Sequence, residues 1–296
     1  DAVFFPWYSQ DSSGKPIIYL GVKGMVSLEL VARGGPWGGP TAHGIHGSHA
    51  VWFHSPTWVL VEALASMMSP DQKHVLIDGF YDRVEPPSAE DESLLARLAE
   101  TFDDRLPLQE NEVLRYKYDL RGVELLREYL YQPMLNINGI ASGYIAEGIK
   151  ALLPHEASAK VDFRLVPRMR PEEVVAGIKD HLARQGYADK IEVIVRQGYP
   201  WAKTGLNNSA TQAMIQTYRS LGYEPEIWPH IGASVPLYLF TEVLGLPVVT
   251  GGLGHGGRLH SPNEYATVAG MRLCEKSIAA FMANFAAQSP VGEKVD

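Results

Sequence analysis

Two segments of this sequence alternate apolar and polar residues so regularly that they constrain the fold more than any other feature. In 157–166, valine, phenylalanine and leucine alternate with lysine, aspartate and arginine, and Arg164 falls on the polar face. In 25–33, valine and leucine alternate in the same way with serine and glutamate. A period of two predicts β-strands that bury one face and expose the other. We therefore expect a sheet that is covered by helices on one side.

Helices and further strands surround these two segments in a recognisable order. One helix is expected after Pro56, a favourable residue for a first helical turn, and a second from Pro171 to Gly186, a C-cap glycine. Two more strands are expected at 135–141 and 191–195. Residues 24–197 then read β-α-β-β-α-β, once a polar, helical segment at about 78–131 is set aside as an insertion. This order predicts a ferredoxin-like domain, a four-stranded antiparallel sheet with two helices on one face.

The rest of the chain has a different pattern. Residues 1–23 read as strands, and 198–296 alternate helices with short apolar strands, which predicts an α/β domain. The helices of this part are expected at 208–221, 235–244 and 266–287. Because a buried strand starts almost at Asp1, we expect the sequence to be the later part of a longer protein.

Composition excludes several classes of partner. Lys and Arg minus Asp and Glu give 26 − 34 = −8, which argues against nucleic acid and against anionic membranes. An RNA-binding role for a ferredoxin-like domain would need a basic face with stacking aromatics, and this chain is acidic. No segment approaches the ~20 apolar residues of a membrane span. Its single cysteine, Cys274, excludes an intrachain disulfide and favours the cytoplasm.

Two segments suggest ligand binding by their composition. Residues 251–257 contain Gly-x-Gly-x-x-Gly, but Pro262 and a polar turn follow where a dinucleotide site requires a helix, so this match is weak. His43, His46 and His49 recur every three residues in a glycine-flanked loop, with His54 beyond. Imidazoles at this spacing match no established zinc motif, and a histidine-rich loop tip is an equally good interpretation.

Two polar residues are candidates for substrate contacts. Ser234 lies between an expected strand and an expected helix, as a hydrolase nucleophile does, although Pro236 replaces the usual glycine and a simple helix cap is the alternative. A serine hydrolase would use His260 with Glu242 or Glu264. Arg164 is suited to binding a carboxylate with two parallel hydrogen bonds, and an ion pair with Asp162 is the alternative.

Several motifs together resemble the zinc aminoacylase and peptidase family that includes carnosinase, carboxypeptidase G, acetylornithine deacetylase and succinyl-diaminopimelate desuccinylase. These motifs are Lys-Pro-Ile-Ile-Tyr-Leu-Gly-Val-Lys-Gly at 15–24, Asn-Ile-Asn-Gly-Ile-Ala-Ser-Gly-Tyr at 136–144, the strand and turn at 157–167, and His-Ser-Pro-Asn-Glu at 260–264. The resemblance covers nearly the whole chain. It implies a catalytic α/β domain, here 1–23 and 198–296, interrupted by a lid at 24–197 through which the protein forms a homodimer.

The resemblance also implies a chemistry and a set of site residues. His260 matches the last zinc ligand, and His46 matches a lid histidine that reaches the partner's site and polarises the scissile carbonyl. Arg164 and Ser234 match residues that hold the substrate's carboxylate. The reaction implied is hydrolysis of an amide in a dipeptide or an N-acyl amino acid, using two zinc ions, with cobalt or manganese as alternatives.

This sequence departs from the family pattern at several positions. The remaining carboxylate ligand should fall near Pro6 and Trp7, which cannot bind zinc unless Asp1 or Asp11 substitutes in a shifted register. Ala151 stands where a hydrogen-bonding residue is expected. Four further metal ligands and the general base should precede residue 1, so the chain alone is expected to be inactive. The alternative is a degenerate member of the family that binds an amino acid or serves as a dimerisation module.

Overall fold

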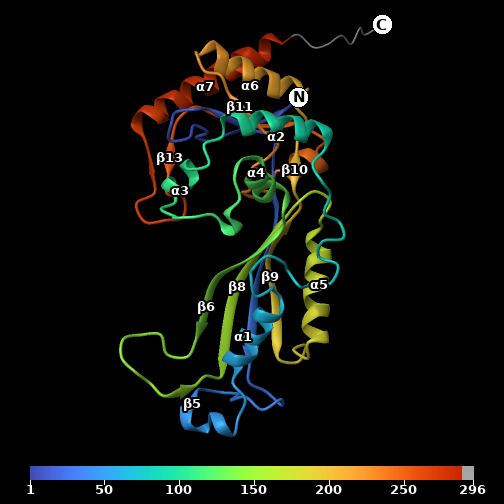
Figure 1. The fold of residues 1–296 in the computed structure, drawn as a ribbon, viewed down its shortest axis with the longest axis vertical. Coiled ribbons are helices and arrows are strands. Elements are labelled where there is room, and N and C mark those ends of the chain that lie inside the picture. The colour runs from blue at the N-terminus through green and yellow to red at the C-terminus, as the bar shows by residue number, and fades with distance from the viewer. Residues whose placement is uncertain (289–296) are drawn as a thin grey trace. The chain divides into compact units, whose positions relative to one another are not determined.

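The computed structural model describes residues 1–288, and the chain folds as two compact units (Figure 1). Among the described residues, unit 1 consists of Asp1–Lys23, Pro86–Gln132 and 202–288, and unit 2 consists of Gly24–Glu85 and Pro133–Trp201. No helix among the described residues is long and apolar enough to span a membrane.

Unit 2 contains the sheet expected from the alternating segments. Its strand order is β6 (Met134–Ser142), β8 (Glu156–Leu165), β4 (Gly24–Arg33) and β9 (Ile191–Tyr199), and all neighbours are antiparallel. Strands β4 and β8 pair over their whole length, from Gly24 opposite Leu165 to Arg33 opposite Glu156. The ferredoxin-like topology predicted from the β-α-β-β-α-β order is therefore confirmed.

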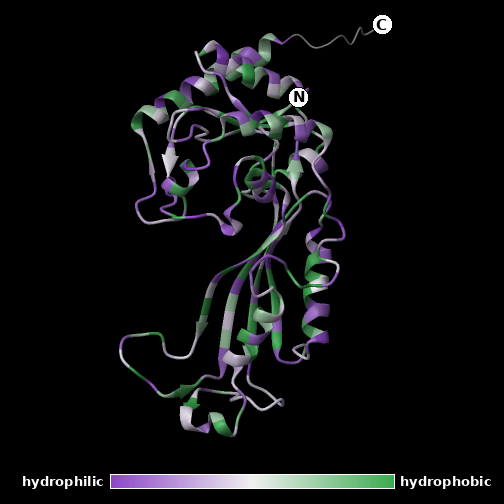
Figure 2. Ribbon diagram, viewed as in Figure 1, coloured by the Kyte–Doolittle hydropathy of each residue, from purple (hydrophilic) through white to green (hydrophobic). Residues whose placement is uncertain are grey.

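Two helices cover one face of this sheet and form its core. Helix α1 (Pro56–Ser66) starts at the predicted proline, and α5 (Pro171–Arg184) is followed by Gly186 in a left-handed conformation, φ +78°. Both helices bury apolar residues against the alternate residues of β4 and β8 in one continuous cluster. In Figure 2, α5 accordingly carries both hydrophobic and hydrophilic residues.

A short ladder lies beyond one end of β8. Strand β5 (Ile45–His46) pairs with β7 (Leu152–Leu153), and the 3-10 helix η1 (Gly47–Val51) follows β5 directly. Because β7 ends three residues before Glu156, this ladder belongs to the Glu156 end of β8.

Unit 1 is built on several short strand pairs. Strands β1 (Val3–Pro6) and β12 (Val248–Gly251) are parallel, as are β2 (Ile17–Tyr19) and β11 (Glu226–Trp228). The pairs β3 (Gly21–Val22) with β10 (Ala202–Lys203) and β13 (Gly256–Gly257) with β14 (Tyr265–Ala266) are antiparallel. Helices α6 (Ser209–Ser220) and α7 (Val268–Ala287) pack together. The helix expected at 235–244 is only a π-helical turn, η3 (Leu239–Val243).

The helical segment expected as an insertion of the lid packs instead with unit 1. It contains α2 (Ala89–Thr101), α3 (Leu106–Glu110), the 3-10 turn η2 (Lys117–Asp119) and α4 (Gly122–Tyr131). Helices α2 and α4 bury leucines against Ile17 of β2 and Trp228 of β11. The sequence did not predict this packing. Helical periodicity shows which faces of α2 and α4 are apolar, but it does not show which distant strands those faces cover.

Candidate substrate-binding site

His46 is held at the exposed tip of unit 2 by the β5–β7 ladder. It lies opposite Leu152, and the next residue, Gly47, donates its N–H to the carbonyl of Ala151 at 2.8 Å. The Ser48 N–H donates to His46 Nδ1 at 3.2 Å, and the Ser48 hydroxyl lies 2.8 Å from the same nitrogen. Because Nδ1 accepts the backbone amide, Nε2 is the ring nitrogen that carries a proton and can donate, and the His46 side chain is exposed.

The other histidines of this loop do not join His46 in a metal site. His49 lies beside His46 but packs against Trp52 and Phe53, while the His54 ring contacts Trp37. Nowhere among residues 1–288 do three His, Cys, Asp or Glu side chains come together as metal ligands would. The histidine spacing therefore reflects an aromatic loop tip.

Arg164 lies at the other end of unit 2's sheet. It pairs in register with Met25, next to the start of β4, and its Nε donates to Asp162 Oδ2 at 3.0 Å. This is the ion pair considered from the sequence, and the guanidinium keeps further donors with about a quarter of the side chain exposed. Arg164 and Glu156 are eight positions apart on β8, roughly 26 Å at ~3.3 Å per residue, and His46 lies beyond Glu156. Within one chain, unit 2 does not bring these two residues together.

Ser234 lies in unit 1, in the loop that follows β11. The loop continues without helical structure to η3, so Ser234 does not occupy the strand–turn–helix elbow of a serine hydrolase. Ligands of parallel sheets bind at the carboxyl ends of strands, and Ser234 follows the carboxyl end of the parallel-paired β11.

His260 lies in the exposed loop between β13 and β14. The backbone N–H of His260 donates to Glu264 Oε2 at 3.3 Å. The backbone of this loop is left-handed at Arg258, His260 and Asn263, which all have φ near +61°. Three non-glycine residues with left-handed backbone within six positions form a strained turn, as is common in ligand-binding loops. Like Ser234, this loop follows a parallel-paired strand, β12.

The position expected for a carboxylate ligand is apolar in the structure. Pro6 ends β1 opposite Gly251, and the indole of Trp7 packs edge-on against Phe5 and Tyr19 at 5.9 and 5.7 Å between ring centroids. Asp11 does not substitute for it, since its Oδ1 accepts the N–H groups of Ser13 and Lys15 and the Ser13 hydroxyl in a local turn. The described residues therefore do not form a complete metal site, and His260 is the chain's candidate contribution to one.

Two buried residues, His230 and Lys23, hold the loop that carries Ser234 and were not predicted from the sequence. His230 is 1% exposed, and burial lowers the pKa of its imidazole to about 4. Lys23 is 4% exposed and donates to the carbonyls of Tyr129 and Gln132, both at 2.7 Å. No sequence pattern indicates that His230 and Lys23 are buried, because their burial depends on α4 packing beside the loop.

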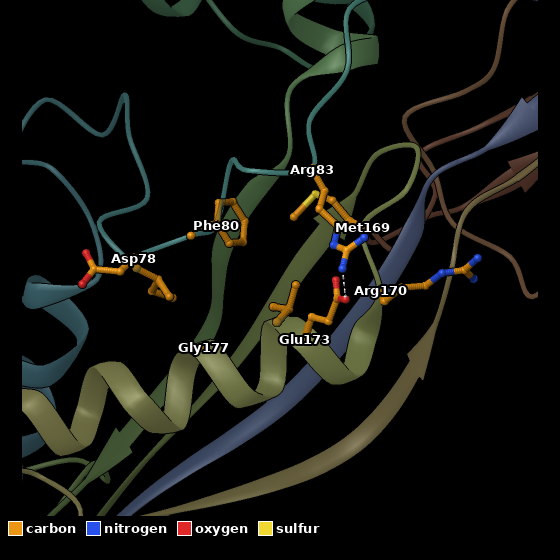
Figure 3. Close-up of a pocket in the computed structure, with 10 residues that line it drawn as sticks. Asp78, Phe80, Arg83, Met169, Arg170, Glu173 and Gly177 are labelled. Atoms are coloured by element: carbon orange, nitrogen blue, oxygen red, sulfur yellow. Dashed lines mark hydrogen bonds and ion pairs between the residues drawn. The ribbon is translucent and has the colours of Figure 1, made fainter.

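A small pocket of about 60 Å³ lies at the N-terminal end of α5 (Figure 3). Phe80 and Met169 line it, and an ion pair of 2.6 Å joins Arg83 to Glu173 at its side. It contains none of the expected site residues, so the pocket is not part of the candidate site.

Comparisons with known proteins agree with this architecture. Residues 39–190, just over half of the chain, match the peptidase dimerisation domain of the M20 family. The rat Beta-Ala-His dipeptidase is 26% identical over 87% of this chain and 51% of its own length. The Cys-Gly metallodipeptidase DUG1 of Saccharomyces cerevisiae is 23% identical over 93% of this chain and 56% of its own length. The chain thus spans about half the length of the curated relatives it matches.

Solved structures show the same similarity in three dimensions. The M20 family metallo-carboxypeptidase Sso-CP2 from Sulfolobus solfataricus has a TM-score of 0.81 and 28% identity, covering 94% of this chain and 62% of that one. The dipeptidase Dug1p from Saccharomyces cerevisiae, at 22% identity, shares the fold with a TM-score of 0.85 over 98% of this chain and 60% of that one. The motifs, the ferredoxin-like topology of unit 2 and these matches lead to one conclusion: the chain belongs to the M20 peptidase family.

Proposed function

We propose that the full-length protein is a metal-dependent hydrolase of the amide bond in a dipeptide or an N-acyl amino acid, with two zinc ions, and that it acts as a homodimer. The dipeptidase names of its relatives support this substrate class. This chain supplies the lid and the C-terminal part of the site. His260 would be its one metal ligand, and the others would have to lie outside the described residues.

The observation that carries the proposal is the separation of His46 from Arg164 within unit 2. A dipeptide is at most ~7 Å long, whereas the backbone positions of Arg164 and His46 lie roughly 26 Å or more apart along unit 2's sheet. One substrate can therefore contact both residues only if they come from two copies of the chain. This supports a dimer in which each site receives His46 from the partner.

The chain's own residues bind and orient the substrate in this proposal. Arg164 holds the substrate carboxylate with its remaining N–H donors, and the Ser234 hydroxyl donates to the same group. His46 Nε2–H donates to the oxygen of the scissile carbonyl, where negative charge develops during attack. In this proposal all three side chains act as hydrogen-bond donors to negatively charged oxygens of the substrate.

Complementation between inactive variants tests the proposal. His46→Ala and Arg164→Ala are each expected to abolish hydrolysis of Cys-Gly and β-Ala-His by the full-length protein. When the two variants are co-expressed with different tags, a mixed dimer contains one site with both side chains intact. The purified mixed dimer is then expected to recover about half of the wild-type activity, since a twofold dimer has two equivalent sites.

The result that would overturn this arrangement is a stable mixed dimer without recovered activity. Pairing the wild-type chain with the double variant His46→Ala/Arg164→Ala is the matched control, because each site of that mixed dimer then lacks one of the two side chains. Chelator treatment of the wild-type protein should remove the activity, and re-added zinc should restore it.

A degenerate, non-catalytic member of the family is a second candidate, favoured by the environment of Trp7. Its indole N–H is buried without a partner among the described residues, where the family resemblance places a carboxylate. Such a protein would form the dimer but bind fewer than two metal ions per chain. Metal analysis of the full-length dimer, together with the activity assay, distinguishes the two candidates.

A further inference from the structure

The loop that carries Ser234 is fixed to the end of helix α4 by a set of contacts inside unit 1. His230 Nε2 lies 2.6 Å from the carbonyl oxygen of Leu130. Facing an acceptor, this nitrogen must carry the proton, so the imidazole donates to the last turn of α4. Burial keeps the pKa of His230 near 4, and the ring therefore stays neutral in this tautomer at ordinary pH.

The residues between His230 and Ser234 are held as well. Ile231 N–H donates to the carbonyl of Gly21 at 2.9 Å. Gly232 lies so close to the ring of Tyr129 that a Cβ atom would come within 2.5 Å of it, so a side chain there would displace the loop from α4. The carbonyl of Ala233 accepts the N–H of Lys23 at 3.0 Å.

Lys23 joins the two sides of this arrangement. Its backbone holds the loop at Ala233, and its ammonium donates to the carbonyls of Tyr129 and Gln132 at the end of α4. A cation is favourable at this end of a helix, where backbone carbonyls lack intrahelical partners. Each of the four residues before Ser234 thus makes a contact that holds the loop. Three of these contacts are made with α4 itself or with Lys23, which is bound to α4.

We propose that His230 and Lys23 are positioning residues, which use the end of α4 as a platform to hold Ser234 at the distance needed to bind the substrate's carboxylate. The inference rests on the role of Ser234 proposed above. It also assigns a function to the segment 86–132, whose last helix supports a substrate contact 100 residues further along the chain.

Steady-state kinetics of the full-length protein with Cys-Gly and β-Ala-His test the functional step. Ser234→Ala is expected to raise KM about tenfold, the effect of losing one hydrogen bond to a charged group. His230→Leu should raise KM by a similar factor with little change in kcat, and should have no further effect in the Ser234→Ala background. His230→Gln keeps an N–H donor for Leu130 and should stay near the wild-type KM.

A buried histidine of unit 2 offers a matched control. His181 is 4% exposed and its Nε2 lies 2.9 Å from the Ser66 hydroxyl. His181→Leu should destabilise the protein as His230→Leu does but leave KM unchanged. Equal KM values for the two leucine variants, or additive effects of His230→Leu and Ser234→Ala, would overturn the positioning role.

Amide hydrogen exchange in this chain tests the anchoring without any activity. His230→Leu is expected to increase amide exchange at least tenfold at Ile231, whose N–H bonds to Gly21, and at Lys23, whose N–H bonds to Ala233. His230→Gln and His181→Leu are expected to leave exchange at both amides unchanged. Unchanged exchange would refute the anchoring itself. Loss of protection with no KM effect of Ser234→Ala would instead reject the proposed function of Ser234 and, with it, the positioning role.

Discussion

The two units of this protein differ in what they bury. Unit 2 has one continuous apolar cluster between its sheet and the helices α1 and α5, and among the described residues it buries the polar side chains of Asp162 and His181. Unit 1 has three smaller apolar clusters and, between its segments, buried polar groups that include Lys23, Asp91 and His230. The first kind of core follows from local patterning, whereas the second depends on pairs of residues that are far apart in the sequence.

That difference predicts how each unit responds to mutation. An apolar core loses stability in proportion to the contacts and volume removed. A core with buried polar groups loses stability when one partner of a pair is removed and recovers it when both are replaced. The following predictions test this contrast, from the largest expected effect to the smallest.

Phe163→Ala should lower the free energy of unfolding by about 4 kcal/mol, since it leaves a cavity at a position without solvent exposure. The ring lies at the centre of unit 2, 5.8 Å from the ring of Phe80. Urea denaturation monitored by circular dichroism measures the loss, with Ile149→Ala as the control, because Ile149 is 98% exposed. A loss below about 1 kcal/mol would mean that unit 2 does not depend on a close-packed core.

Lys203→Met should cost about 3 kcal/mol, because it leaves the buried carboxylate of Asp91 without its ion-pair partner. Burial opposes the charge of Asp91, but the hydrogen bond and charge of Lys203 outweigh it and keep the pKa of this carboxyl below its usual value. The double variant Asp91→Leu with Lys203→Met should recover most of the stability. If the two single losses add instead, the residues do not act as a pair in unit 1.

The elements of unit 2 could be predicted closely from the sequence, for the same physical reason that its core is apolar. Alternation placed β8 within one residue of Glu156–Leu165, and a proline and a left-handed glycine marked the two ends of α5. These signals are local, so a single sequence contains them. The β-α-β-β-α-β order of the elements is typical of one common antiparallel topology, the ferredoxin-like one, and the structure has this topology.

Much of unit 1 could not be predicted in this way. The segment 86–132 is amphipathic, but only the folded chain shows that its leucines cover Ile17 and Trp228. The helix expected near Ser234 is a short π-helical turn, because Pro236 and the anchors of this loop determine its backbone instead of helical periodicity. Residue types and spacing single out His46, Arg164, Ser234 and His260, and only the family resemblance gives each a role, so these roles stay predictions. No sequence pattern predicts the contacts of His230 and Lys23 that hold the Ser234 loop.

Acid should destabilise unit 1 through His230, the smallest of the three effects. The pKa of its imidazole is lowered by burial from 6.5 to about 4, so the unfolded chain binds a proton that the folded chain excludes. Stability is therefore full above pH 6.5 and falls as the pH drops towards 4, by about 2 kcal/mol between pH 7 and pH 5. Carboxylates with lowered pKa values, such as Asp91, stay ionised in this range and contribute little to the slope. Urea denaturation of the wild type and of His230→Gln at both pH values isolates the histidine, since glutamine keeps the hydrogen bond to Leu130 but does not titrate. A pH effect of equal size in the two proteins would show that the folded chain protonates His230 as readily as the unfolded chain does, so that burial in unit 1 does not exclude the proton.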